Sequence, residues 1–486
     1  MGTSTKLVYA SQISPATILR EFTLGSQWKT TASIVGSDAF ALVLVFVFAV
    51  VWRHVLSPAY ELAYGLHLIP CAMMLLVAFW AQGLYPGVLL HSAEEMRRIV
   101  FSASLVFLVV ASTSFLVRNV ESYSRSVFLV SWVAAPPAVL LMRYVLRRWL
   151  AGKRWWGVPA LVLGTGPIAR RVVLSMQNGS SGVKVVGVLS AAQVESWPED
   201  LPPILGDIIH CPNIAESGVA QYVIVAMPEK SAIEIRHTIQ DYCRGFSHVF
   251  FVPDMPGVCS LGVSAREIGA EFGLEMPQRL FHKSAAVCKR VLDLILGGLA
   301  LLIALPLFFA ISTLIKLTSR GPVFYEDRRF GRNGVVIKAL KFRTMVPNAA
   351  VVLADYLAGH PELRVEWQRD HKLKNDPRVT RVGKWLRRLS LDELPQLLNV
   401  LAGEMSLVGP RPIVEAEIEK YGRGYGLYTR VLPGLTGLWQ VSGRNNTTYG
   451  ERVGFDEYYV CNWSIWLDAY ILIRTVKVVL TGEGAY

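Results

Sequence analysis

The chain has 486 residues, 52% of them hydrophobic and only 18% charged, which indicates a membrane protein with room for three domains. Its net charge of +12 fits attraction to anionic membrane lipids. The basic residues are spread along the chain without a recognition motif, which argues against a nucleic acid as partner. Six cysteines without a Cys-x-x-Cys pair argue against a metal or disulfide framework.

Four apolar segments open the chain, each close to the length that crosses a bilayer: 34–52, 66–81, 99–117 and 127–145. We expect a four-helix transmembrane domain over residues 1–150, with no ionisable residue at mid-span and hence no ion path. Basic residues gather around the end of the fourth segment: Arg143, Arg147, Arg148, Lys153 and Arg154. The positive-inside rule then predicts a multi-pass membrane domain with both ends in the cytoplasm.

Residues 151–283 alternate between short apolar runs and helical spacers, which predicts a Rossmann-like cytoplasmic domain with a parallel sheet. The runs are 159–163, 183–189, 222–226 and 248–252. Gly164-x-Gly166-x-x-Ala169 follows the first run and resembles a dinucleotide-binding turn. The end of the second run, however, lacks the acidic residue that would hold a ribose. A structural or regulatory module is therefore favoured over a redox cofactor site.

A fifth apolar segment covers about 291–317. Lys289 and Arg290 precede it and Lys316 follows it, so both flanks fit the cytoplasmic side. Pro306 stands in its middle, where proline removes a helical hydrogen bond. We predict a re-entrant helix that breaks at Pro306, a structural residue, and returns to the same face. A plain fifth span is the alternative.

Residues 284–486 read as a mixed α/β domain with strands at 323–325 and 335–342. Ser390 and Glu393 form a capping-box pattern that predicts a helix from Leu391 to about Gly403. Its buried stripe would be Leu391, Leu394, Leu397, Leu398 and Leu401. Two adjacent carboxylates, Asp392 and Glu393, would occupy the first turn. Acids there often only complement the helix dipole.

Cations flank these two carboxylates in the sequence. Arg387 and Arg388 lie just upstream, and Arg411 lies downstream within Gly-Pro-Arg-Pro. Acids, basic groups and a helix N-terminus together suit an anionic phosphate ester with a divalent metal. The rigid backbone around Arg411 suits a bidentate contact to phosphate.

Four motifs in order resemble those of the bacterial sugar transferases, the polyprenyl-phosphate phosphoglycosyl transferases with a monotopic catalytic domain. They are Lys-Phe-Arg-Thr-Met at 341–345, Asp-Pro-Arg-Val-Thr-Arg at 376–381, Ser-Leu-Asp-Glu-Leu-Pro-Gln-Leu at 390–397 and Gly-Glu-Met-Ser-Leu-Val-Gly-Pro-Arg-Pro at 403–412. The resemblance implies transfer of a hexose-1-phosphate, galactose-1-phosphate first of all, from a UDP-sugar to undecaprenyl phosphate. This is the first membrane step of O-antigen (lipopolysaccharide) or exopolysaccharide synthesis.

The resemblance also implies roles for single residues. Asp392 would be the nucleophile and form an aspartyl-phosphosugar, while Glu393 would hold Mg²⁺. Lys341 and Arg343 fall on a family motif and would bind phosphate, as would Arg411; we add Arg387 and Arg388 as substrate-binding candidates. The protein would be a multi-pass protein of the bacterial cytoplasmic (inner) membrane with its catalytic domain on the cytoplasmic face, and a homodimer is expected.

One other mechanism and two other functions stay open from the sequence alone. Both acids could bind metal while the polyprenyl phosphate attacks the UDP-sugar directly. The chain could be a membrane-anchored regulatory or assembly protein of polysaccharide synthesis. It could also be an NAD-dependent nucleotide-sugar dehydratase or epimerase, although the middle domain lacks a convincing Tyr-x-x-x-Lys pair.

Overall fold

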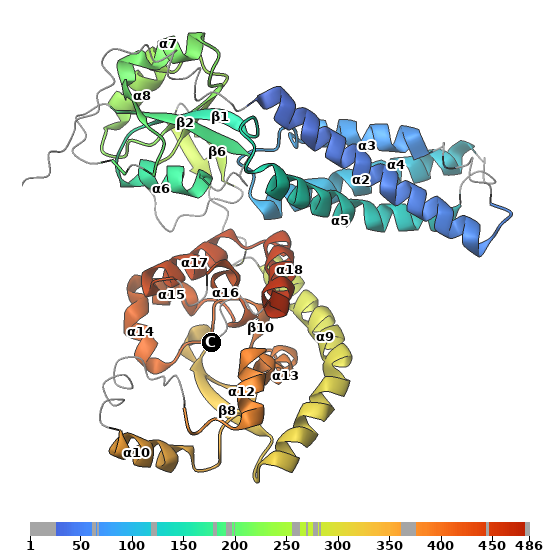
Figure 1. Cartoon of the computed structure of the whole chain (residues 1–486), viewed down its shortest axis with the longest axis vertical. Coiled ribbons are helices and arrows are strands. Elements are labelled where there is room, and N and C mark those ends of the chain that lie inside the picture. Colours follow the sequence, from blue (N-terminus) through green and yellow to red (C-terminus); the bar gives the residue numbers. More distant parts are fainter. Residues whose placement is uncertain are drawn as a thin grey trace, which may run out of the picture. The chain divides into compact units, whose positions relative to one another are not determined.

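The structure is a computed structural model that describes residues 26–481 except 61–64, 66–67, 118–123, 178–181, 191–196, 199, 255–262, 269–270, 276–279, 281–282, 361–375 and 444–446. It divides into two compact units, Met1–Met255 and Pro256–Tyr486 (Figure 1). The first unit contains a helical bundle and a parallel sheet. The second contains the four motifs.

The bundle consists of four helices packed side by side: α2 (Gln27–Leu56), α3 (Ile69–Ala81), α4 (Ser92–Val117) and α5 (Arg125–Leu150). Among the described residues, α2, α4 and α5 are long and apolar enough to cross a membrane. Three of the four predicted apolar segments are therefore helices of sufficient length to span a membrane. The described α3 has 13 residues, or about 20 Å of helix, which is shorter than a hydrocarbon core of about 30 Å.

A buried ionic cluster joins the bundle helices near one end. The Arg143 guanidinium on α5 donates to Asp38 on α2 and to Glu95 on α4, with Nη1 of Arg143 2.7 Å from Oε1 of Glu95. Asp38 and Arg143 are almost fully buried. Arg147 also pairs with Glu95 at 2.7 Å. Arg143 and Arg147, two of the cations used to predict the membrane orientation, are therefore paired with carboxylates inside the bundle. Asp38, an ionisable residue, lies buried within the first predicted segment.

The sheet of the first unit has five parallel strands in the order β3-β2-β1-β4-β5. Their bounds are β1 Val158–Leu163, β2 Val183–Ser190, β3 Ile204–Asp207, β4 Tyr222–Val225 and β5 His248–Phe251. Helix α6 (Pro167–Met176) covers one face, while η2 (Ile208–His210), α7 (Cys211–Glu216) and α8 (Ala232–Tyr242) cover the other. The four predicted strands are present, and the short β3 was not predicted.

The second unit begins with an antiparallel hairpin, β6 (Ser264–Ile268) and β7 (Glu271–Glu275). Helix α9 (Lys283–Thr318) follows and has 36 residues. It stays helical through Pro306, so the predicted break of the helix there is wrong. Figure 1 shows α9 following a curved path along the unit, as expected where proline removes a hydrogen bond.

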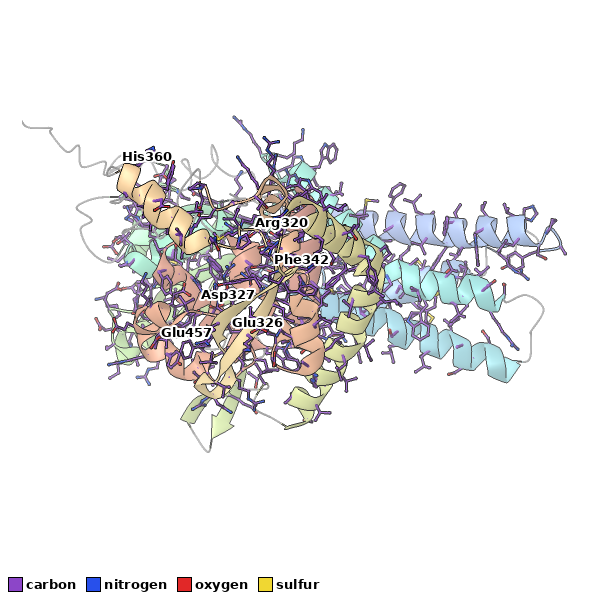
Figure 2. The ribbon with its side chains drawn as sticks, turned by 90° about the horizontal axis from the view of Figure 1, so that it is seen from below. Arg320, Glu326, Asp327, Phe342, His360 and Glu457 are labelled. Atoms are coloured by element: carbon purple, nitrogen blue, oxygen red, sulfur yellow. The ribbon has the colours of Figure 1, made fainter. Side chains whose placement is uncertain are left out.

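Two stretches of α9 are attached to this one unit. Near its N-terminus, the Lys289 ammonium lies 2.8 Å from Asp468, and the Arg290 guanidinium donates to the carbonyl oxygen of Val400 at 2.6 Å. Near its C-terminus, Ile311 and Ile315 pack against Phe342, which Figure 2 labels. Between these stretches much of α9 is exposed and apolar.

The other elements form the body of the second unit around two small sheets. The hairpin β8 (Phe324–Phe330) and β9 (Val336–Phe342) is antiparallel, and β10 (Ser406–Val408) pairs with β11 (Gly434–Thr436). The remaining elements are η4 (Arg332–Gly334), α10 (Ala349–Gly359), α12 (Arg381–Arg388), η5 (Leu391–Glu393), α13 (Gln396–Ala402), α14 (Glu415–Tyr421), η6 (Gly422–Gly424), α15 (Tyr425–Tyr428), α16 (Leu438–Ser442), α17 (Tyr449–Asn462) and α18 (Ile465–Thr481).

Candidate active site

The hairpin β8–β9 supplies one wall of the site. Asp327 pairs with Ala339 across the hairpin, and Arg329 pairs with Ile337. Because side chains alternate along a strand and paired residues share a face, Asp327, Arg329 and Lys341 lie on the same face. The Lys341 ammonium is 3.5 Å from Asp327, and the Arg329 guanidinium donates to Asp327 at 2.7 Å.

The turn that carries the two carboxylates is not the start of an α-helix. Ser390 adopts a left-handed conformation with φ 54°, and its side chain makes no capping hydrogen bond. Leu391–Glu393 forms a single 3-10 turn, η5, and α13 begins only after Pro395. Proline fits the first turn of a helix and not its interior. The predicted capping box and helix start at Leu391 are therefore wrong.

Helix α13 ties this turn to the hairpin. The Asn399 side chain accepts from the backbone of Leu340 and donates to that of Lys338, both at 2.9 Å. Leu397 is buried as predicted, whereas Leu398 is 38% exposed, contrary to the predicted stripe. Gly403 ends α13 with φ 87°, as predicted. The carboxylates are thus held against β9.

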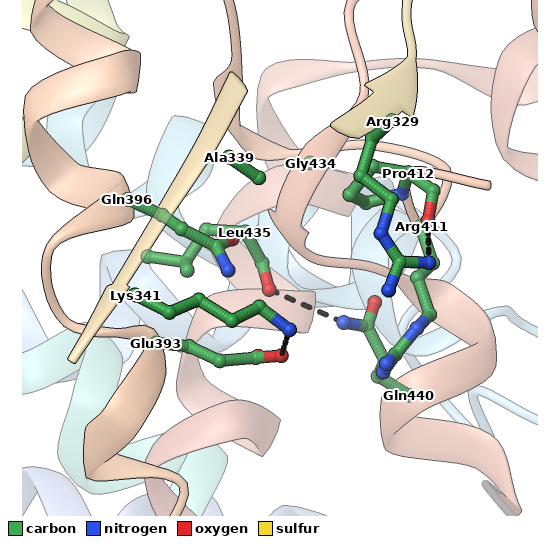
Figure 3. Close-up of a pocket in the computed structure, with 10 residues that line it drawn as sticks. All are labelled: Arg329, Ala339, Lys341, Glu393, Gln396, Arg411, Pro412, Gly434, Leu435 and Gln440. Atoms are coloured by element: carbon green, nitrogen blue, oxygen red, sulfur yellow. Dashed lines mark hydrogen bonds and ion pairs between the residues drawn. The ribbon is translucent and has the colours of Figure 1, made fainter. Parts of the chain in front are cut away.

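The side chains from these elements meet in one small depression that is partly open to solvent. Figure 3 shows Lys341 and Glu393 on one side and Arg329, Arg411 and Gln440 on the other. Oε1 of Glu393 is 3.3 Å from the Lys341 ammonium. The other lining residues are Ala339, Gln396, Pro412, Gly434 and Leu435. Cations and one carboxylate therefore converge where a diphosphate could lie.

The two carboxylates have opposite pKa shifts. Burial and the neighbouring charge of Glu393 raise the pKa of Asp392 to about 6, against the cations Lys341 and Arg387. Burial alone would also raise the pKa of Glu393, but Arg411 and Lys341 outweigh it and hold that pKa below its usual value. Glu393 is therefore the permanent anion, and Asp392 is an anion only above about pH 6.

The structure brings some of the predicted residues together and leaves others apart. Lys341, Glu393 and Arg411 line the depression. Arg387 acts on Asp392 and donates to the Thr344 hydroxyl at 2.9 Å.

Three predicted arginines, Arg343, Arg387 and Arg388, lie outside the depression's lining, and so does Asp392. The Arg343 guanidinium is buried and donates to the carbonyl oxygen of Ser319 at 3.0 Å, just after the end of α9. Arg388 is exposed.

Next to Arg411 lie one aromatic ring, that of Trp439, and a second cation, Arg452. Its guanidinium carbon lies 5.9 Å from the Trp439 ring centre, and that of Arg452 lies 4.7 Å from the same ring. Arg452 is buried and pairs with Glu417 at 2.8 Å. Trp439 therefore touches one cation that lines the depression and one that does not.

Sequence reasoning missed Arg329, Gln396 and Gln440 as lining residues. Arg329 could have been found, because Gly331 and Gly334 mark a hairpin turn and alternation along the strands places Arg329 on the face of Lys341. Gln440 comes from α16, about a hundred residues after Lys341 in the chain. No local signal links two such distant segments.

The two carboxylates differ from a metal site built from protein ligands alone. Among the described residues, no group of three or more His, Cys, Asp or Glu side chains could hold a metal ion. Mg²⁺ commonly binds through one or two carboxylates together with substrate phosphates and water. Asp392 and Glu393 beside a cationic depression fit this second kind of site.

Two family models match the chain. Residues 284–482 match the family described as bacterial sugar transferase, and residues 81–253 match the one described as CoA-binding domain. The first match contains every lining residue of the depression. The second covers α4, α5 and the parallel sheet.

Several curated proteins are similar to this chain. The undecaprenyl-phosphate galactose phosphotransferase of Salmonella typhimurium is 36% identical over 81% of this chain and 82% of its own length. The exopolysaccharide production protein ExoY of Rhizobium meliloti is 45% identical over 50% of this chain and 98% of its own length. The UDP-glucose:undecaprenyl-phosphate glucose-1-phosphate transferase of Klebsiella pneumoniae is 33% identical over 59% of this chain and 60% of its own length.

Proposed function

Because this chain belongs to the bacterial sugar transferase family, we propose that it transfers a hexose-1-phosphate from a UDP-sugar to undecaprenyl phosphate and releases UMP. The observation that carries the proposal is the depression in which Glu393 meets Lys341, Arg329 and Arg411. Three cations around one carboxylate suit a diphosphate, because guanidinium groups bind phosphate oxygens in bidentate fashion. The adjacent Asp392 supplies a second carboxylate at the edge of this charge cluster.

Asp392 is the proposed nucleophile. Its carboxylate oxygen attacks the phosphorus that carries the sugar, the bond to the bridging oxygen of UMP breaks, and an aspartyl-phosphosugar remains. Lys341 and Arg411 stabilise the charge on the departing UMP. The undecaprenyl phosphate oxygen then attacks the same phosphorus, which restores the Asp392 carboxylate and completes the transfer.

Glu393 and the substrate diphosphate would hold Mg²⁺, with Asp392 nearby. The ion would neutralise charge on the leaving group. In this arrangement Lys341 and Glu393, which are 3.3 Å apart, both face the diphosphate. Glu393→Gln should then weaken the dependence of transfer on Mg²⁺ concentration, which titration of activity with the ion would measure.

The covalent route and direct attack differ in one observable. Only the covalent route exchanges labelled UMP into UDP-sugar when polyprenyl phosphate is absent. Asp392→Asn should abolish this exchange and leave binding of UDP-sugar largely intact. An active wild-type enzyme without any exchange would exclude the covalent step and leave Asp392 as a metal ligand.

The proposed sugar is galactose, because the Salmonella relative, whose name specifies galactose, matches over 82% of its length. The Klebsiella relative is named for glucose and matches over 60%. UMP release by the purified protein should therefore be measured with UDP-galactose, UDP-glucose and other UDP-hexoses. If UMP release were fastest with a UDP-sugar other than UDP-galactose, only the proposed donor would be wrong. The proposed pathway is O-antigen or exopolysaccharide synthesis.

For the parallel-sheet domain, the proposal is a Rossmann-like module with a structural or regulatory role. The strand order β3-β2-β1-β4-β5 supports this fold. Where β2 ends, the Ser190 hydroxyl lies 3.1 Å from that of Thr165, so a hydroxyl stands where a ribose-binding acid is usual. Thermal stabilisation of the protein by NAD(H) would contradict this assignment and favour the dehydratase or epimerase alternative.

For α9, the proposal is a bent re-entrant helix that enters and leaves the inner membrane on the cytoplasmic side. Its two attached stretches support this, because Lys289 and Ile315 contact the same compact unit. A full crossing would put these stretches on opposite sides of a hydrocarbon core of about 30 Å. Because α9 is continuous through Pro306, the proposed role of this proline is to bend the helix without interrupting it.

A homodimer formed through the parallel sheet is also proposed. β5 is an edge strand, and within the described residues it pairs only with β4. Its residues are all exposed, with Phe250 at 38% and Phe251 at 45%. An apolar edge of this kind favours two-fold pairing with a second copy. Mass photometry in nanodiscs should show dimers, and monomers alone would contradict the proposal.

A further inference from the structure

A third carboxylate, that of Asp327, lies next to the depression but not in its lining. Asp327 belongs to β8, where Figure 2 labels it, and the small, buried Ala339 stands opposite it on β9. The same carboxylate oxygen, Oδ2, lies 2.7 Å from the Arg329 guanidinium and 3.5 Å from the Lys341 ammonium. One oxygen of Asp327 therefore faces two cations of the depression, one from each strand of the hairpin.

Neither cation depends on Asp327 alone for its position. The Arg329 guanidinium also lies 3.5 Å from the carbonyl oxygen of Pro412, and the Lys341 ammonium lies 3.3 Å from Oε1 of Glu393. Both distances from Lys341 to a carboxylate exceed the length of about 2.7–2.9 Å that is usual for a charge-assisted hydrogen bond. The ammonium is therefore shared between Asp327 and Glu393 and is free to move toward a third anion.

The charge of Asp327 acts at short range on whatever binds in the depression. The side chains of Arg329 and Lys341 are 18% exposed and that of Asp327 is 19% exposed, so water screens their charges only in part. Three cations line the depression, and Asp327 offsets the charge of one of them. A phosphate that enters must therefore compete with the Asp327 carboxylate for the same two cations.

We infer that Asp327 is an internal counter-ion, which holds Arg329 and Lys341 in place before substrate binds and weakens the binding of phosphate groups. The inference rests on the proposed function, in which the depression receives the diphosphate of a UDP-sugar and releases UMP. Asp327 is a positioning residue here and does not react. Its like charge beside the bound phosphate lowers the affinity for UMP and so favours release of this product.

The test measures binding of inorganic pyrophosphate and of UMP to the full chain in nanodiscs by isothermal titration calorimetry. Asp327→Asn removes the charge and keeps a hydrogen-bond acceptor of the same size, so Kd for both anions should fall about threefold to tenfold. Asp327→Glu keeps the charge and should bind both anions as the wild type does. A gain in affinity identifies the effect of charge, because damage to the fold would weaken binding.

Glu326→Gln is the matched control. Glu326 is the neighbour of Asp327 on β8 and points to the other face of the hairpin, where it lies 2.8 Å from Lys338 and its side chain is 54% exposed. This variant removes the same charge from the same strand. It should leave Kd for pyrophosphate and for UMP unchanged.

Steady-state kinetics give a second measurement of the same effect. In Asp327→Asn, KM for the UDP-sugar and the inhibition constant of UMP should fall together, and kcat should not rise. Equal Kd values in Asp327→Asn and Glu326→Gln, or weaker binding in Asp327→Asn, would overturn the inference. If Asp327→Asn tightened pyrophosphate binding in a protein that released no UMP from any UDP-sugar, the proposed function would be refuted, while the action of Asp327 on phosphate would stand.

Discussion

The charge state of Asp392 sets the pH at which the nucleophile is available. Its pKa is raised to about 6 by burial and by Glu393, and Lys341 opposes that rise. Attack requires the carboxylate, so kcat/KM should fall about tenfold per pH unit below pH 6 and level off above pH 7. Lys341→Met removes an opposing cation and should move this acid limb to higher pH. The measurement is kcat/KM against pH with saturating Mg²⁺.

Lys338→Met is the matched control for that shift. Lys338 lies on the same strand, is paired with Glu326 and has a side chain that is 64% exposed. Its removal should leave the acid limb in place. If both variants moved the limb equally, the profile would report net charge and not the contact between Lys341 and the catalytic turn.

Arg452 is expected to position Arg411 through Trp439. Arg452→Met removes an ion pair and the ring contact at 4.7 Å, and should lower the free energy of unfolding by about 2–4 kcal/mol. It should also raise KM for UDP-sugar several-fold with little change in kcat. Arg452→Lys should restore part of the stability and part of the KM. Thermal unfolding and steady-state kinetics measure the two effects.

Arg423→Met serves as the control for stability, because Arg423 is exposed in η6. It should be neutral in both measurements. A loss of stability in Arg452→Met without any change in KM would show that Arg452 supports the fold alone and does not position Arg411.

At the scale of elements, the C-terminal end of α9 should lie on the same, cytoplasmic side of the membrane as the segment that follows α5. Thr318→Cys and Lys153→Cys are compared by labelling with a membrane-impermeant maleimide. Both should stay unlabelled in intact spheroplasts and become labelled in inverted vesicles. Labelling of the two positions from opposite sides would show that α9 crosses the membrane, against the re-entrant proposal.

Apolar patterning predicted which elements exist, while their exact starts depended on contacts that the sequence does not display. The four predicted strands of the parallel sheet are present. Three of them, β1, β2 and β4, are buried parallel strands, which read as continuous apolar runs, while β5 is an exposed edge strand. The helix start at Leu391 was wrong because the Ser-x-x-Glu spacing does not reveal the left-handed Ser390. Pro395, two residues after Glu393, was the available signal for a later start.

The site was predictable where motifs contain it. Glu393, Lys341 and Arg411 were predicted and line one depression. Arg343 and Arg388 belong to equally suggestive segments but lie outside its lining, since neighbours along a strand or helix point in different directions. A motif therefore identifies a segment, and strand alternation decides which of its side chains reach the site.

At the scale of the whole molecule, residues 1–283 should be dispensable for chemistry. The bacterial sugar transferase match begins at residue 284 and contains every lining residue of the depression. The match to the Rhizobium relative likewise covers only 50% of this chain but 98% of the relative. A fragment of residues 284–486 should therefore release UMP in the presence of UDP-sugar and acceptor. The same fragment with Asp392→Asn gives the background, and a folded but inactive fragment would contradict the prediction.

The attachment of α9 at two stretches to one unit has a consequence for the choice of acceptor. If both stretches stay on one side of the membrane as proposed, the depth to which α9 inserts sets the distance between the catalytic turn and the bilayer. The catalytic turn then reaches the acceptor at the depth of the acceptor's phosphate, while the prenyl tail lies among the lipid acyl chains. We expect such an enzyme to sense the depth of the phosphate and to be nearly indifferent to the length of the tail.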